Sequence, residues 1–159
     1  MDFNDRRNST CCFTGHRMIS DDEREKLSDR LSETIEKLID DGVVYFVCGG
    51  ALGFDTMAAN AVINARRHHH LIKLIVITPC RNQSVSWTIR DRRTYDDILL
   101  QADGVVCLSE KYYDGCMQAR NRRMVDISSR CVAYMRHKRG GTAYTVKYAE
   151  ENGLSVMFL

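Results

Sequence analysis

Six short apolar runs alternate with helix-length amphipathic segments along this 159-residue chain. The runs are rich in Val, Ile, Cys and Phe, and we expect strands at residues 10–14, 43–48, 73–78, 104–109, 130–135 and 155–159. Several runs are apolar at consecutive positions, so both faces of these strands must be covered. Buried strands separated by helices are typical of a parallel sheet with a helix in each crossover.

The intervening segments carry helix signals. The first begins with Ser20 and Glu23 at capping-box spacing and ends at Gly42. Further helices are expected at residues 55–69, 87–101, 116–129 and 142–152. The pattern predicts an α/β fold, a single Rossmann-like, doubly wound, mostly parallel sheet of about six strands with helices on both faces. Such sheets bind ligands outside the carboxyl ends of their strands.

The composition favours one globular domain. Hydrophobic residues make up 44% of the chain and charged residues 28%. No linker or repeat divides it, so we expect a flexible N-terminal tail at residues 1–9 and a single domain at residues 10–159. A net charge of +2 supplies no strong field to steer the protein toward nucleic acid or an anionic membrane.

The cysteines and the N-terminus bear on location. Seven cysteines is an odd number and none forms a CxxC pair, which favours reduced thiols over a disulfide or zinc framework. The N-terminus lacks an apolar signal core, and no stretch approaches the roughly 20 apolar residues of a membrane span. We therefore expect a cytoplasmic protein with no membrane partner.

Two glycine pairs follow strand-like runs and open helix-like segments. Glycines there let backbone amides approach an anion, and a helix N-terminus adds partial positive charge. The first turn, residues 48–55, is neither a G-x-G-x-x-G fingerprint nor a Walker A loop. The ligand contacts expected in the two turns are Gly49, Gly50, Ala51, Gly53, Gly140, Gly141 and Thr142.

Asp55, at the end of the first glycine turn, has two possible roles. Its carboxylate can cap the helix that begins there. Alternatively, it can accept a hydrogen bond from a ribose hydroxyl or position a substrate. The sequence leaves both roles open.

Two other polar segments are expected near the same ligand. The first strand runs into Thr14, Gly15, His16 and Arg17, where an open α/β sheet has its first turn. The basic run at residues 120–123 opens a helix and opposes its dipole unless it faces an anion. From this run we select Asn121 and Arg122 as ligand contacts, and interpret Arg123 as part of a solvated face.

The sequence gives little support for a metal site or for covalent catalysis. The histidines at residues 68–70 are consecutive, with no nearby carboxylate or cysteine to complete a ligand set. No Ser-His-Asp order or H-E-x-x-H motif is present. We expect no metal and no cofactor.

In their order, these motifs resemble the SLOG superfamily, named for the Smf/DprA and LOG proteins, and within it the YpsA-like branch. The resemblance covers about residues 10–159. The segments that carry it are residues 14–17, 49–55, 77–79 with Gln83 and Trp87, 95–103, 120–125 and 140–143. It implies a Rossmannoid fold that binds a nucleotide-derived ligand, and a possible homodimer.

LOG enzymes hydrolyse the N-glycosidic bond of nucleoside monophosphates with an arginine and with the glutamate of a P-G-G-x-G-T-x-x-E motif. In this chain Thr145 stands at the glutamate position and the proline is absent. The resemblance therefore does not carry over the catalytic carboxylate. If a reaction occurs, Asp55 and Arg122 are the candidate catalytic residues.

Three functions follow. The first is a sensor or sequestering protein that binds a nucleotide or a nucleotide-derived phosphorylated molecule through the glycine turns. The alternative is a nucleoside-monophosphate N-glycosidase with Asp55 as acid or electrostatic stabiliser. The third is single-stranded DNA binding, which the low net charge and the lack of an evident aromatic platform disfavour.

Overall fold

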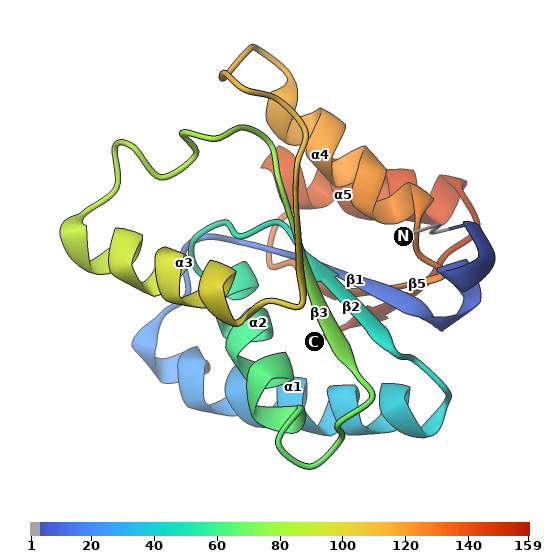
Figure 1. Cartoon of the computed structure of the whole chain (residues 1–159). Coiled ribbons are helices and arrows are strands. Elements are labelled where there is room, and N and C mark those ends of the chain that lie inside the picture. Colours follow the sequence, from blue (N-terminus) through green and yellow to red (C-terminus); the bar gives the residue numbers. More distant parts are fainter. Residues whose placement is uncertain (1–3) are drawn as a thin grey trace.

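The computed structural model describes residues 4–159, which form one six-stranded sheet and five α-helices (Figure 1). The strands are β1 (Thr10–Gly15), β2 (Tyr45–Cys48), β3 (Lys73–Thr78), β4 (Gly104–Cys107), β5 (Arg130–Tyr134) and β6 (Ser155–Phe158). The helices are α1 (Asp21–Asp40), α2 (Phe54–Ala65), α3 (Ile89–Gln101), α4 (Cys116–Asp126) and α5 (Gly140–Glu151). Every strand pair is parallel, which confirms the predicted fold class. None of these helices combines the length and apolar character that a bilayer-spanning segment requires.

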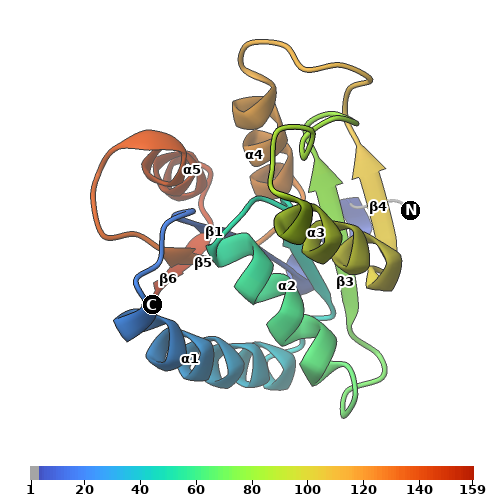
Figure 2. The same cartoon turned by 90° about the vertical axis from the view of Figure 1, so that its left-hand side faces the viewer.

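The strand order places a topological switch point beside β1. The sheet runs β4-β3-β2-β1-β5-β6, so the chain builds outward from β1 to β4 and then returns to add β5 on the other side. Helices α1, α2 and α3 cover one face, and α4 and α5 cover the other (Figures 1 and 2). The crevice where the order reverses lies between the carboxyl ends of β1 and β5.

Each face of the sheet has its own core. Successive side chains on a strand point to opposite faces. On β1, Phe13 therefore packs into one cluster and Cys12 into the other, and on β2 Phe46 and Val47 divide in the same way. All four are fully buried. This two-sided burial explains the continuous apolar runs of the sequence.

The capping box predicted for the first helix and the predicted start of the third are wrong. Ser20 occupies the N-cap position of α1, but its side chain makes no capping hydrogen bond, so the predicted capping box does not form. The side chain of Glu23 turns instead to Tyr134 and Arg136. Helix α3 begins at Ile89 rather than at residue 87, because the Thr88 side chain accepts the Asp91 amide at 3.1 Å and caps the helix there.

Part of the segment expected as a flexible tail, residues 4–9, has local structure. Asn4–Ser9 form a short 3-10 helix, η1. Arg7 Nε donates to the Ser128 carbonyl at 3.0 Å, and Thr10 Oγ1 donates to the Arg6 carbonyl at 2.8 Å. These contacts attach η1 to the sheet. Residues 1–3 of the predicted tail lie outside the described residues.

Gly53 fixes the start of α2 against the turn that follows β1. It has a φ of 78°, and a Cβ atom there would lie 2.1 Å from the Arg17 carbonyl oxygen. Its neighbour Phe54 donates its amide to the His16 carbonyl at 3.1 Å. The β1–α1 turn and the start of α2 are therefore in direct backbone contact.

We expect Gly53→Ala to lower the free energy of unfolding by about 2 to 4 kcal/mol, because positive-φ strain and overpacking act together. Gly153→Ala is the matched control, with a φ of 79° and open space around its added Cβ. It should cost only about 1 kcal/mol, from strain alone. Urea unfolding of both variants measures the difference, and equal costs would contradict the close approach.

Candidate functional site

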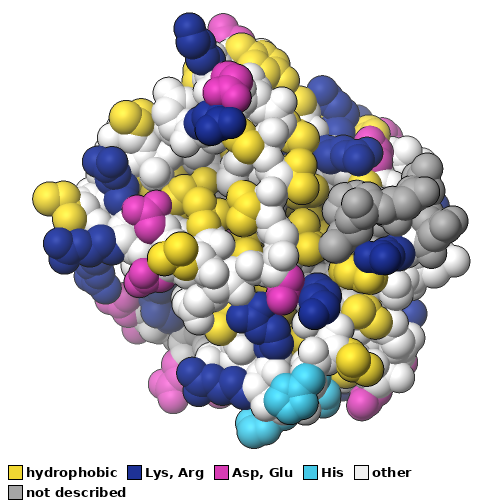
Figure 3. Space-filling view, viewed as in Figure 1, with side chains coloured by type: hydrophobic (Ala, Val, Ile, Leu, Met, Phe, Trp, Pro, Cys, Tyr) yellow, Lys and Arg dark blue, Asp and Glu magenta, His cyan; other side chains and the backbone are white. Residues whose placement is uncertain are grey.

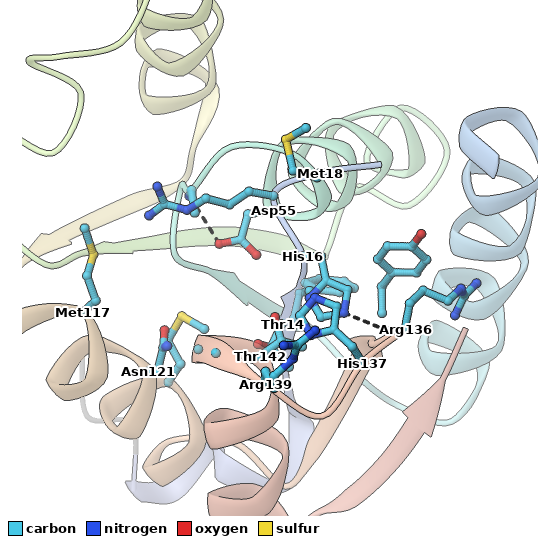
Figure 4. Close-up of a pocket in the computed structure, with 18 of the residues that line it drawn as sticks. Thr14, His16, Met18, Asp55, Met117, Asn121, Arg136, His137, Arg139 and Thr142 are labelled. Carbon is cyan, nitrogen blue, oxygen red and sulfur yellow. Dashed lines mark hydrogen bonds between the residues drawn. The ribbon is translucent and has the colours of Figure 1, made fainter. Parts of the chain in front are cut away.

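A cavity of about 710 Å³ opens at the switch point, between the carboxyl ends of β1 and β5 (Figure 4). Its walls come from the β1–α1 turn, the start of α2, one side of α4 and the segment leading into α5. Ten of the residues expected at a ligand line it, namely Thr14, Gly15, His16, Arg17, Ala51, Asp55, Asn121, Gly140, Gly141 and Thr142. The other four, Gly49, Gly50, Gly53 and Arg122, are not among the lining residues.

The second glycine turn presents unused hydrogen-bonding groups to this cavity. Helix α5 starts at Gly140, whose φ is 84°, and Arg139 at the N-cap position makes no side-chain cap. Within residues 4–159, the amides of Gly140, Gly141 and Thr142 have no protein acceptor. The first turn of α5 also contains no acidic residue. The positive end of this helix is therefore open to an external anion.

Two threonine hydroxyls line the same cavity. The side chains of Thr14 and Thr142 belong to residues that are only 6% and 7% exposed. Neither hydroxyl has a hydrogen-bond partner in the described part of the chain, and no fully buried side-chain oxygen there lacks one. Both hydroxyls must therefore open onto the cavity. A polar group that is nearly buried and unpaired calls for a partner from outside the protein.

The first glycine turn differs, because it carries an acceptor of its own. The Ala51 amide donates to Asp55 Oδ2 at 3.2 Å. The amides of Gly49 and Ala51 both lower the pKa of this carboxyl group. The anion held by this turn is thus the protein's own Asp55.

Arg120 lines the cavity and supports this turn, although the sequence analysis did not select it as a site residue. It is only 4% exposed. Its Nη1 donates to the Gly49 carbonyl and, at 3.3 Å, to Gln83 Oε1. A Cβ atom on Gly49 would lie 2.5 Å from the same nitrogen, so only glycine leaves room for the guanidinium. The spacing of residues in the sequence could have indicated its burial. Cys116, Arg120 and Met124 are four residues apart, on one face of α4, and all three are buried.

Burial and charge oppose each other at Asp55. Burial raises the pKa of its carboxyl group, while Arg120, the two turn amides and Arg17 lower it. Burial likewise lowers the pKa of the Arg120 guanidinium, and the nearby Asp55 raises it. Each group therefore stabilises the charged form of the other.

The two candidate residues from the basic run, Asn121 and Arg122, lie in different places. Asn121 lines the cavity, and its Oδ1 accepts a hydrogen bond from Arg120 Nε at 2.8 Å. Arg122 Nη1 instead donates to the Tyr144 hydroxyl at 2.9 Å, on the α4–α5 surface. Arg122, a candidate catalytic residue in the sequence analysis, therefore does not line the cavity.

His16 ties the cavity wall to the segment before α5. Its Nε2 accepts the Arg136 amide at 2.8 Å, so the ring proton of the neutral form sits on Nδ1 (Figure 4). The ring stacks on His137, with centroids 4.1 Å apart. Arg136 Nε donates to Glu23 at 2.9 Å, and the Tyr134 hydroxyl donates to the same carboxylate. These contacts hold the residues before Gly140 in place.

We expect the folded protein to lose stability as pH falls below about 6.5. Burial, His137 and Arg136 lower the pKa of His16 from its ordinary value of 6.5. The unfolded chain therefore takes up a proton that the folded chain resists, and stability present above pH 6.5 is lost as pH falls through the folded pKa. The free energy of unfolding of His16→Gln, measured across pH 5–8, should change less with pH than that of the wild type. His70→Gln, a change at an exposed position, should keep the pH dependence of the wild type. An equal loss of pH dependence in both variants would contradict this role of His16.

Relatives and solved structures resemble this chain over most of its length. A UPF0398 protein from Halalkalibacterium halodurans is 34% identical over 75% of this chain and 65% of its own length. The SPbeta prophage-derived protein YoqJ of Bacillus subtilis is 32% identical over 81% of this chain and 83% of its own. This chain thus spans less than two thirds of the Halalkalibacterium protein.

The fold is shared with DNA processing protein A. The protein from Helicobacter pylori matches with a TM-score of 0.70 and 19% identity, over 98% of this chain and 66% of that one. The protein from Streptococcus pneumoniae matches with a TM-score of 0.67 and 20% identity, over 95% and 50% respectively. The model of the YspA SLOG family matches residues 11–157. This confirms the resemblance drawn from the motifs, and the chain belongs to the YspA SLOG family.

Proposed function

We propose that the cavity binds a nucleotide or a nucleotide-derived phosphorylated molecule, with a phosphate at the start of α5. The observation that carries this proposal is the combination of the free amides of residues 140–142 with the unpaired hydroxyls of Thr14 and Thr142, all within the described part of the chain. A phosphate accepts several hydrogen bonds at once and is attracted by the positive end of the helix. It therefore satisfies every open group of this turn together.

The remaining walls suit the rest of such a ligand. The volume of about 710 Å³ falls within the usual range for small-molecule sites. Met117 and Met124 on α4 supply apolar surface, and Asn121 beside them supplies an amide. Arg17 and Arg139 add positive charge to the cavity lining. An apolar wall with a few polar groups favours a base and sugar over a bare inorganic ion.

The residues fit a protein that binds a nucleotide without hydrolysing it better than they fit an N-glycosidase. Thr145 stands where the LOG motif has its glutamate, and its hydroxyl donates to the Gly141 carbonyl at 2.8 Å within α5. Asp55 already accepts the Ala51 amide, and Arg122 contacts Tyr144 outside the cavity. We therefore propose a sensor or a sequestering protein.

We expect Thr142→Val to weaken binding of adenosine 5′-monophosphate about 10-fold, because a hydrogen bond to a charged phosphate is lost. The stability of the unliganded protein should hardly change, since the hydroxyl has no partner in the described residues. Titration calorimetry measures the affinity, and thermal unfolding measures the stability.

Thr145→Val is the matched control on the same helix, because its hydroxyl is already used within α5. It should leave the affinity unchanged. If neither nucleotides nor ribose 5-phosphate stabilise the folded wild-type protein, the proposed phosphate site is wrong.

Single-stranded DNA is a second candidate, because DNA processing protein A from Helicobacter pylori, which shares the fold, has a single-stranded DNA binding mode. Arg136, His137 and Arg139 line the cavity and Lys138 lies between them, which gives a short basic segment at its rim. On the face seen in Figure 3, however, Lys and Arg side chains are scattered among acidic ones around a hydrophobic centre. That face therefore offers no continuous basic track.

Binding of a 20-nucleotide oligothymidylate at 50 and 200 mM salt distinguishes a single-stranded DNA site from a small-molecule site. A strand that contacts several phosphates should lose affinity steeply, with a logarithmic slope of about −0.7 per phosphate neutralised. For a small-molecule site we expect only weak binding at either concentration. Tight binding at 50 mM salt that falls with this slope at 200 mM, and that Lys138→Gln with Arg139→Gln abolishes, would favour the DNA candidate.

A further inference from the structure

The cavity has a second polar wall, formed by Asp55 at the start of α2. Figure 4 shows the Asp55 carboxylate on one side of the cavity and Thr142 with Arg139 on the other. Asp55 is only 6% exposed, and what remains exposed faces this cavity. A ligand held at α5 therefore meets a carboxylate across the same space.

The carboxylate retains capacity to accept hydrogen bonds. An ionised carboxylate has about four acceptor sites, and the Ala51 amide uses one of them. Arg120 acts on Asp55 through its charge, while its guanidinium donates hydrogen bonds to other groups, among them the Gly49 carbonyl. Because a carboxylate can only accept, the group that completes it must be a donor such as a hydroxyl.

Asp55 and the anion-binding hydroxyls lie on neighbouring pieces of chain. Thr14 is two residues before His16, and the His16 carbonyl accepts the amide of Phe54, the residue that precedes Asp55. Gly53 packs against the Arg17 backbone in the same contact. One compact molecule can therefore reach both groups. In a ribose 5-phosphate unit, a phosphate and a vicinal pair of hydroxyls are joined by one five-carbon sugar.

We infer that Asp55 accepts hydrogen bonds from the sugar hydroxyls of the bound ligand, so that the cavity selects ribose phosphates over their 2-deoxy counterparts. This inference rests on the proposed phosphate site and adds to it a specificity-determining residue. The alternative is that Asp55 only holds the β2–α2 turn. A purely structural Asp55 leaves binding indifferent to the 2-hydroxyl.

Titration calorimetry with four probes tests the inference. The probes are ribose 5-phosphate, 2-deoxyribose 5-phosphate, adenosine 5′-monophosphate and 2′-deoxyadenosine 5′-monophosphate. Wild-type protein should bind each ribose form about 10-fold or more tightly than its 2-deoxy partner, as a hydrogen bond to a charged group implies. Asp55→Asn, which turns an amide donor toward the hydroxyls, should reduce that ratio to about one.

Thr142→Val is the control at the other wall, and it should weaken both members of a pair while keeping their ratio. Equal wild-type affinities for ribose and 2-deoxy forms would overturn the inference and leave the phosphate site standing. The same holds if Asp55→Asn weakens both forms equally. Failure of all four probes to bind would instead reject the phosphate site itself. A wild-type ratio of one overturns the inference even if Asp55→Asn does not fold.

Discussion

The contact between a backbone amide and the Asp55 carboxylate makes the two glycine turns different, because an amide with an internal acceptor is not free to bind a ligand. At the start of α2, the Ala51 amide donates to Asp55, and the Gly49 carbonyl accepts from the buried Arg120. That turn holds a carboxylate of the protein itself. At the start of α5 the first turn contains no carboxylate, and its amides open onto the cavity. One closed turn and one open turn thus define which end of the site can take an anion.

The parallel sheet brings these two turns to the same crevice. Strand β1 lies between β2 and β5, so the turns that follow β2 and β5 flank the turn that follows β1. The backbone contact of Gly53 with Arg17 joins the first pair, and the hydrogen bond from the Arg136 amide to His16 joins the second. The β1–α1 turn is therefore the shared wall that sets how the carboxylate and the open helix end face each other.

The sequence predicted the sheet well because two-sided burial leaves a direct trace, the continuous apolar runs. It predicted helix starts less well, because Glu23 has partners on β5 and in the segment after it that no local pattern reveals. Arg120 was missed because the basic run was judged by charge, whereas its four-residue spacing from Cys116 and Met124 marked it as buried. The glycine pairs look alike in sequence. The distinguishing signal was the carboxylate in the first turn of α2, which α5 lacks.

The most direct test of the open and closed turns is a residue-resolved one. Amide ¹H–¹⁵N spectra recorded during titration with ribose 5-phosphate report each backbone N–H separately. The largest shifts should fall on the amides of Gly140, Gly141 and Thr142, which gain an acceptor, while the amide of Ala51 moves little because its acceptor is already present. A large shift at Ala51 with none at residues 140–142 would contradict the assignment of the anion site to α5.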